Sequence, residues 1–558
     1  MPRWLLVTSA IVVAGLLGLA GLLLYKGTPL SEILSLLTAD AVVQLREEMR
    51  PARADGQRVL VVALDGVGAE AFREAVGSGG MPRVAALLGA ALDGADGLYA
   101  HGSAPNGVLS ILPSTTFAAW TTTYTGVGVA EHGVPGNEWF DRESLTFVAP
   151  APVSVHENGD ALRVYSDSLM HRWIAVPTLF ERANVRSYVT LAAQYRGADL
   201  LVRPDAGTFA DLVAAFTAGI VADEATREPY SALDIEAVDQ TLEAIEEHGL
   251  ADLQIVYFPG VDLFTHVSDA AIPDQKRYLA EVIDSAVGRL LDAYRARGAL
   301  DSTYVLFISD HGHTPSLADE QHALGAGGDG EPADALVAAG FRVRPFELET
   351  EDDSFQAVLA YQGAIAYVHL ADRSTCPGEG DRCDWLAPPR LEEDILPVVR
   401  AFAEAGRTGA GASKLQGAID LIFARESHGV EPAGPFQVWD GEALVPVATY
   451  LAAHPRPDLL DLERRLDALA VGRYGHRAGD VLILSRYRED DPESDRYYFS
   501  ASYRSWHGSP SRQDSEIVFA VARPASTGAA LRDRVHAVVG ATPSQLDVTA
   551  LILDLLGR

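Results

Sequence analysis

Runs of consecutive apolar residues alternate along this chain with stretches of helical periodicity. The clearest run spans residues 58–66, is apolar after Arg58 and ends in Asp65 and Gly66. Such continuous runs are typical of strands buried on both faces of a parallel sheet, and the periodic stretches between them are the covering helices. Similar runs occupy residues 186–193, 254–258, 303–309 and 516–522. The pattern predicts an α/β fold, a three-layer α/β/α sandwich with a mostly parallel central sheet.

Acidic and histidine residues stand where these predicted strands end. Asp65 follows the first strand, and residues 303–309 run directly into Asp310 and His311. In open α/β sheets the functional groups collect beyond the carboxyl ends of the strands. Asp and His suit Zn²⁺ and similar ions. The alternative for Asp310 and His311 is a hydrogen-bonded pair that finishes a strand.

Two further histidines belong to the same group of candidates. Asp262 and His266 follow the strand at 254–258 and would share one face if the segment is helical. The preceding Pro259 and Gly260 make a loop equally compatible with the sequence, and taken alone the pair could be two solvated polar residues. His507 lies on a predicted turn at residues 505–510, just before the last strand.

A hydroxyl-rich segment precedes another apolar run. Pro113 is followed by Ser114, Thr115 and Thr116, a pattern that is typical of a helix N-terminus. Unpaired N–H groups and the helix dipole attract anions at such a position. A hydroxyl here could cap the helix, or it could be a nucleophile that faces a bound phosphate.

The chain is long enough for more than one structural unit, since it has 558 residues. From about residue 320 to 470 the regular alternation of strand and helix is lost, which predicts an inserted cap subdomain. The predicted organisation is an anchor and stalk at 1–57, a first part of the core at 58–320, the cap at 321–470 and a second part of the core at 471–558.

The N-terminus predicts a membrane anchor. Residues 4–25 are uncharged and nearly all apolar or small, between Arg3 and Lys26, and such a run spans a bilayer as a helix. A retained signal anchor is the interpretation, with a cleaved signal peptide as the alternative.

The chain has two cysteines, Cys376 and Cys383, in a Gly- and Pro-containing loop. They predict a small disulfide in an oxidising compartment. The alternatives are two free thiols or part of a metal site. With the anchor, the disulfide predicts a single-pass membrane protein whose catalytic body is periplasmic or extracellular.

The formal net charge is −33, which argues against a nucleic-acid-binding surface. It does not argue against an anionic substrate, because bound divalent metals would invert the local field. The strand-end residues could supply two such metal sites of three protein ligands each, with open positions for catalysis. Two neighbouring metals can activate an attacking oxygen and stabilise a leaving oxygen in phosphoryl transfer.

Taken in order, these motifs resemble the alkaline phosphatase superfamily, specifically its type I phosphodiesterase/nucleotide pyrophosphatase branch. Thr116-Phe117, Thr125-Gly126, His132-Gly133 and Gly136-Asn137 fall at the offsets of that branch without a gap. Its Asp-x-x-x-His, Asp-His-Gly and late His-Gly motifs are matched by Asp262 with His266, by Asp310 with His311, and by His507. The resemblance covers residues 58–315 and 470–556.

The resemblance implies a role for each of these residues. Thr116 would be the nucleophile, and Asp262, His266 and His507 would hold one zinc ion. Asp65, Asp310 and His311 would hold the other, which would also contact the Thr116 oxygen. Asn137 and the Phe117 backbone N–H would donate to a phosphoryl oxygen, and the reaction would pass through a phosphothreonine. His132 and His313 are interpreted as structural or supporting residues.

One departure concerns substrate preference. After Phe117 the chain has Ala118, Ala119 and Trp120 where the family often has Pro-Asn-His. The predicted function is a two-zinc hydrolase of phosphodiester or pyrophosphate bonds that acts on a small phosphate ester. Alternatives are a phosphomonoesterase, a phosphonate hydrolase, a lipid headgroup phosphotransferase and, from another class, a catalytically silent surface binding protein. A membrane anchor would suit a lipid-derived substrate.

Overall fold

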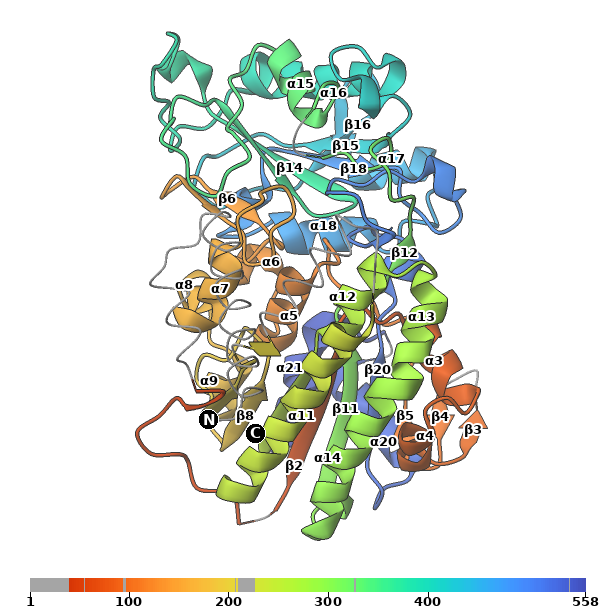
Figure 1. The fold of residues 1–558 in the computed structure, drawn as a ribbon. Coiled ribbons are helices and arrows are strands. Elements are labelled where there is room, and N and C mark those ends of the chain that lie inside the picture. Colours follow the sequence, from red (N-terminus) through yellow and green to blue (C-terminus); the bar gives the residue numbers. More distant parts are fainter. Residues whose placement is uncertain are drawn as a thin grey trace, which may run out of the picture.

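The computed structural model describes residues 40–54, 56–93, 97–205, 207–208, 226–325, 328–540 and 542–558. They form two large sheets, one above the other in Figure 1, with helices on both faces of the larger one, and two small sheets of two strands each. The predicted membrane anchor at 4–25 lies outside the described residues. Within the ranges given above, no helix combines the length and the apolar character that a bilayer span requires.

The larger sheet has ten strands and is mixed. Its strands, from one edge to the other, are β1 (Val42–Gln44), β9 (Leu200–Val202), β8 (Ser187–Thr190), β10 (Leu253–Phe258), β2 (Arg58–Leu64), β11 (Thr303–Ser309), β20 (Phe519–Ala522), β5 (Gly102–Ser103), β4 (Leu98–Tyr99) and β3 (Ala91–Asp93). The stretch from β9 to β11 is parallel. The remaining pairings are antiparallel.

The prediction of a mostly parallel sheet is therefore right only for the centre. The run at residues 516–522 forms β20, which lies antiparallel to β11. The chain leaves β11 at the edge that faces the second sheet, passes through that sheet and returns from the same side (Figure 1). A strand that re-enters at the edge where its neighbour ended must run in the opposite direction, whereas a parallel neighbour needs a crossover connection.

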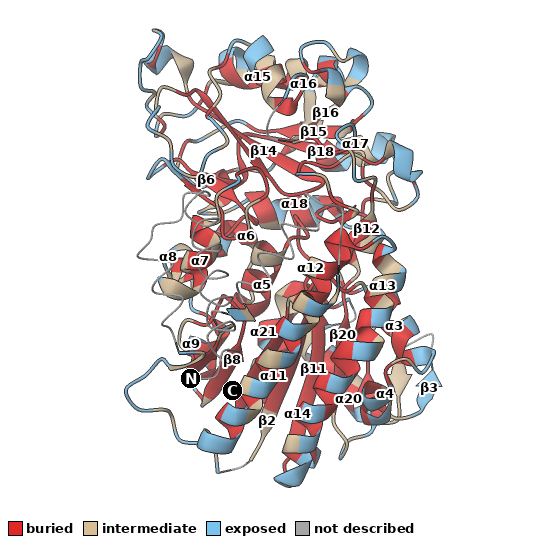
Figure 2. Ribbon diagram, in the orientation of Figure 1, coloured by how far each residue is buried: buried red, intermediate tan, exposed pale blue. Residues whose placement is uncertain are grey.

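Alternate residues of β2 pack on opposite faces of the sheet. Leu60, Val62 and Leu64 belong to the cluster that includes helices α3 (Ala69–Gly77), α11 (Glu228–His248) and α14 (Asp284–Ala296). Val59, Val61 and Ala63 belong to the cluster with α5 (Thr116–Thr125) and α21 (Val548–Leu555). The period of two along the strand thus buries both faces of the sheet, as Figure 2 shows.

The second sheet is antiparallel throughout. Its strand order is β13 (Ala357–Tyr361), β14 (Ile365–Leu370), β18 (Val481–Ser485), β15 (Ile419–Ala424), β16 (Gln437–Trp439) and β17 (Leu444–Pro446). Helices α15 (Pro332–Ala338) and α16 (Leu396–Thr408) lie over it, and Cys376 and Cys383 form the predicted disulfide beside it.

Two predicted boundaries differ from the structure. Residues 481–485, which the sequence assigns to the second part of the core, form β18, and β18 pairs with β14 and β15 of the second sheet. An apolar run predicts a buried strand but not which sheet it joins. The predicted stalk contains β1, an edge strand of the large sheet, and Arg50 donates to Asp199 at 2.8 Å, so residues from 40 onward pack on the body.

Candidate active site

The candidate metal ligands all lie at the edge of the large sheet that faces the second sheet. Asp65 follows β2, and Asp310 with His311 follows β11. Asp262 and His266 project from α12 (Gly260–Val267), the helix that begins just after β10. His507 follows the short strand β19 (Ser505–Trp506). All six side chains are buried. Because Asp262 and His266 both lie within α12, the segment is a helix and not the loop that the sequence also allowed.

These residues form two adjoining clusters. In one, ligand atoms of Asp65, Asp310 and His311 lie within 4.8 Å of one another, and in the other the same holds for Asp262, His266 and His507. His311 Nε2 is 3.3 Å from Asp310 Oδ2, and His266 Nε2 is 3.4 Å from Asp262 Oδ2. The rings of His311 and His507 stack with centroids 3.6 Å apart, which joins the two clusters.

All three histidines are oriented in the same way. The Nδ1 atoms of His266, His311 and His507 lie 2.8, 3.0 and 2.9 Å from the backbone carbonyl oxygens of Ser505, Gly312 and Ser114. A carbonyl oxygen only accepts, so each Nδ1 carries the proton. Each Nε2 then presents a lone pair to the carboxylates, which is the arrangement of metal-ligating histidines.

Two of the carboxylates each have one oxygen without a hydrogen-bond partner. Asp65 Oδ1 and Asp310 Oδ2 are buried without a hydrogen-bond partner. Burial raises the pKa of Asp65 well above its usual value, and the neighbouring Asp310 and Asp262 raise it further. Burial also opposes ionisation of Asp262, but His266 and His313 outweigh it and hold that pKa well below its usual value. Three buried carboxylates and three imidazole Nε2 lone pairs that face them fit two divalent cations.

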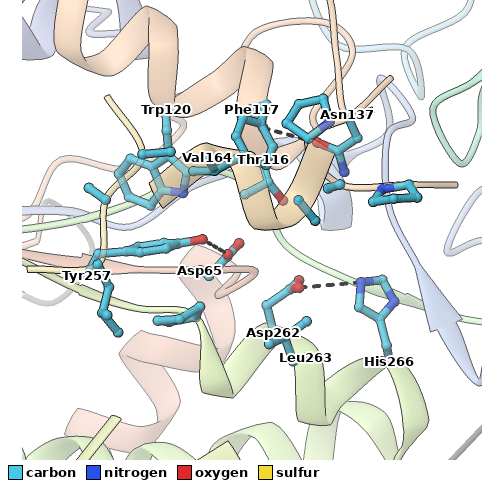
Figure 3. Close-up of a pocket in the computed structure, with 18 of the residues that line it drawn as sticks. Asp65, Thr116, Phe117, Trp120, Asn137, Val164, Tyr257, Asp262, Leu263 and His266 are labelled. Carbon is cyan, nitrogen blue, oxygen red and sulfur yellow. Dashed lines mark hydrogen bonds and ion pairs between the residues drawn. The ribbon is translucent and has the colours of Figure 1, made fainter. Parts of the chain in front are cut away.

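Of the three consecutive hydroxyl residues, Thr116 faces the pocket. Ser114 Oγ donates to Ser509 O at 2.9 Å, and Thr115, the residue before α5, makes no capping hydrogen bond with its side chain. Thr116 is the first residue of α5, and its Oγ1 lies 3.3 Å from His311 Nε2. Figure 3 shows this hydroxyl pointing into the space that Asp65 and Asp262 also face.

Asn137 is held from two sides. Its Oδ1 accepts the Phe117 N–H at 3.0 Å, so its amide NH₂ is the group left to meet a substrate oxygen. The Phe117 N–H, which the resemblance assigns to the phosphoryl oxygen, has Asn137 as its partner in this structure. The Asn137 N–H donates to Oε1 of Gln362, a residue of the second sheet, at 2.8 Å.

Sequence reasoning did not find two supporting contacts, those of Gln362 and Tyr257, whereas it interprets His313 and His132 as structural or supporting residues. Gln362 carries no motif, and it follows Asn137 by 225 residues. The Tyr257 hydroxyl donates to Asp65 Oδ2 from inside β10, where the sequence shows only another apolar-run residue. His313 places Nε2 2.7 Å from Asp262 Oδ1. His132, buried, approaches Thr122 Oγ1 with Nε2 at 2.9 Å and holds α6 (Val129–His132) against α5.

A pocket of about 310 Å³ opens beside Thr116. Its lining includes Asp65, Asp262, His266 and His507. A further acidic group outside this pocket comprises Asp141, Glu143 and His476. Arg477 Nε already donates to Asp141 Oδ1 at 3.1 Å, so that carboxylate is neutralised by a protein cation and we assign it no metal.

Paired carboxylate–histidine clusters beside a hydroxyl at a helix N-terminus define a phosphoric ester hydrolase. Residues 59–327 match the family model for type I phosphodiesterase/nucleotide pyrophosphatase. This stretch, just under half of the chain, is similar to that family. Its sequence matches no curated protein.

Solved structures also resemble the chain. Murine ectonucleotide pyrophosphatase/phosphodiesterase 5 is 13% identical, covers 90% of this chain and 95% of its own, and gives a TM-score of 0.49. An inactive variant of that murine protein in complex with AMP gives 12% identity, the same coverage and a TM-score of 0.48. Human ectonucleotide pyrophosphatase/phosphodiesterase 5 is 13% identical, has the same coverage and gives a TM-score of 0.47.

Proposed function

We propose that this chain hydrolyses phosphodiester or pyrophosphate bonds with two zinc ions and with Thr116 as the nucleophile. One observation carries the proposal: the Thr116 hydroxyl lies at the start of α5, faces the pocket and is 3.3 Å from His311 Nε2, beside both clusters. An oxygen in that position meets the phosphorus of an ester bound between the clusters and the helix N-terminus.

The proposed reaction has two displacements. Thr116 Oγ1 attacks phosphorus, the ester oxygen leaves with its substituent, and a phosphothreonine forms; water then cleaves the phosphothreonine and restores the hydroxyl. When bound, the two ions would lower the pKa of the attacking oxygen and stabilise the leaving oxygen. Asp65, Asp310 and His311 would hold one ion, and Asp262, His266 and His507 would hold the other.

The remaining contacts orient the substrate. The Asn137 carboxamide is fixed by the Phe117 N–H, so its NH₂ is directed at a non-bridging phosphoryl oxygen. The Cys376–Cys383 disulfide supports a catalytic body in an oxidising compartment, periplasmic or extracellular. The apolar residues 4–25 support attachment to the membrane by a single N-terminal pass.

The test compares two nitrophenyl esters with the zinc-loaded protein. We expect a higher kcat/KM for bis-(p-nitrophenyl) phosphate than for p-nitrophenyl phosphate, and loss of both activities in Thr116→Ala. A preference for the monoester would keep the site but make the protein a phosphomonoesterase. Full activity in Thr116→Ala would refute the nucleophile, and zinc binding without turnover of any ester would favour the silent binding protein.

A further inference from the structure

The wall of the pocket beyond Thr116 is apolar. Val164, Leu191, Leu233 and Tyr257 are buried and line it, together with prolines at 150, 152, 204 and 259. Its polar lining outside the two clusters is uncharged and consists of Asn137, Asn158 and Gln194 with the hydroxyls of Thr116 and tyrosines. None of the lining residues that the structure describes is a lysine or an arginine.

Trp120 occupies a central position in this wall. It lies one turn after Thr116 on α5, at the place where the sequence departs from the family pattern. Its ring meets Tyr257 edge to face, with centroids 5.4 Å apart, and stacks on Tyr124 at 5.7 Å. Figure 3 shows Trp120, Tyr257 and Val164 on the same side of the Thr116 hydroxyl. A rigid aromatic and aliphatic surface therefore adjoins the reacting group.

Such a wall discriminates by charge. An anionic group placed against apolar side chains loses its hydration and gains no ion pair, whereas an alkyl or aryl group gains about 25 cal/mol per Å² of buried apolar surface. Cations bound to the two clusters would be shared with the reacting phosphoryl group. No described cationic side chain in the lining is left for a second phosphate or another anion on the substrate.

We propose that this pocket selects phosphodiesters whose second substituent is uncharged and apolar, an alkyl or aryl group, over esters whose substituent carries further negative charge, such as nucleoside polyphosphates. The inference rests on the proposed function and narrows its substrate class. Size is consistent with it, because about 310 Å³ accommodates a small organic group.

The first test uses two substrates that differ only in charge. Hexyl p-nitrophenyl phosphate and 5-carboxypentyl p-nitrophenyl phosphate release the same leaving group, and their chains have nearly the same length. We expect kcat/KM to be at least about tenfold higher for the hexyl ester, the factor that corresponds to 1.4 kcal/mol. Equal values, or a preference for the carboxylate, would overturn the inference.

The second test adds a cation to the wall. Ala161 lies on α7 (Gly159–Ser166), lines the pocket and is half-buried, so a longer side chain there can reach solvent. We expect Ala161→Lys to raise kcat/KM for the carboxypentyl ester relative to the hexyl ester by about tenfold. Ala161→Gln, of similar length and without charge, controls for bulk. The same ratio in both variants would refute selection by charge.

Failure of this inference is distinguishable from failure of the proposed function. If neither ester is turned over while zinc is bound, the catalytic proposal itself fails. If both esters are turned over at equal rates by wild type and lost together in Thr116→Ala, the catalytic proposal stands and the assignment of an apolar substituent is wrong.

Discussion

The two sheets contribute to the site in different ways. The large sheet supplies five of the six candidate ligands, because β2, β10 and β11 end at one edge and the turns or helix that follow carry Asp and His side chains. The sixth, His507, follows β19, which pairs with β12 in a separate two-stranded sheet. The second sheet supplies none of them. Its hairpin tip between β13 and β14, residues 361–364, instead makes hydrogen bonds to the backbone of Asn137 and His507.

The contacts of this hairpin tip are close. Gln362 accepts the Asn137 N–H and donates to Glu138 O. The Ala364 N–H donates to His507 O at 3.1 Å. Gly363 has φ +73°, and a Cβ there would lie 1.7 Å from Trp506 Nε1, so the tip can approach the ligand loop only as glycine. The large sheet thus carries most of the candidate ligands, and the second sheet aligns Asn137 and His507.

The largest expected loss of activity follows from a change beside the candidate ligands. Thr116→Ala removes the proposed nucleophile, and we expect kcat/KM to fall by about 10⁴-fold while the metal content stays the same, because the six ligands remain. Steady-state kinetics with metal analysis of the same sample measures this. Thr115→Ala is the matched control, since that hydroxyl is unpartnered, and its activity should stay within a few-fold of wild type.

Metal removal should also abolish activity. A chelator would leave Asp65, Asp262 and Asp310 buried without cations, so we expect loss of turnover and a lower unfolding temperature, both restored by added zinc. Thermal unfolding with and without chelator measures the second effect independently of activity. An unchanged unfolding temperature would contradict the assignment of cations to these carboxylates.

A smaller effect is expected when the alignment from the second sheet is lost. Gln362→Leu removes both hydrogen bonds to residues 137 and 138, and we expect kcat/KM to fall about 10- to 100-fold as Asn137 loses its position. Gln356→Leu is the control, because the Gln356 side chain also joins two backbone groups, those of Arg342 and Cys376. Equal losses of activity in both variants would indicate a general packing effect.

Stability should depend on pH through His132. Burial lowers the pKa of this histidine to about 3, so it stays neutral in the folded chain, while in the unfolded chain it takes up a proton below about pH 6.5. Its contribution is therefore present above pH 6.5 and lost as pH falls toward 3, by about 1.4 kcal/mol per pH unit. The difference in unfolding free energy between wild type and His132→Gln should shrink at that slope between pH 6 and 4. A constant difference in urea titrations would contradict this.

The smallest effect is expected at the disulfide. Cys383→Ala opens a loop of sequence separation 7, for which loop-closure entropy gives about 2 kcal/mol of lost stability. Urea unfolding of the variant and of the reduced wild type should agree. If reduction changes the wild type but not the variant, the loss comes from the disulfide; equal stability of all three forms would show that it does not stabilise the fold.

The sequence predicts the large sheet's contribution better than the second sheet's. Thr303–Ser309 is a strand with the predicted bounds, and the strand predicted for residues 58–66 spans Arg58–Leu64, because a continuous apolar run can be recognised from neighbouring residues alone. The positions of Asp65 and Asp310 at strand ends can be predicted for the same reason, since both residues directly follow those runs. The direction of β20 and the sheet joined by β18 depend on the path of the chain between strands, which no local pattern encodes.

Long-range contacts account for the rest. Gln362 lies 225 residues from Asn137, and its apolar neighbours indicate only a strand end. Tyr257 reaches Asp65 across 192 residues from a strand whose sequence suggests packing alone. The pattern also could not show that Trp120 lines the pocket, because its spacing from Thr116 fits either a buried helix face or a pocket wall.

The measurement that tests the account most directly is the metal content of the zinc-loaded protein and of two variants. We predict about two zinc ions per chain in wild type, and about one each in Asp310→Asn and Asp262→Asn, because each substitution removes one carboxylate from one cluster. Elemental analysis after gel filtration would give these numbers. No bound zinc in wild type, or an unchanged content in both variants, would contradict a two-cation site.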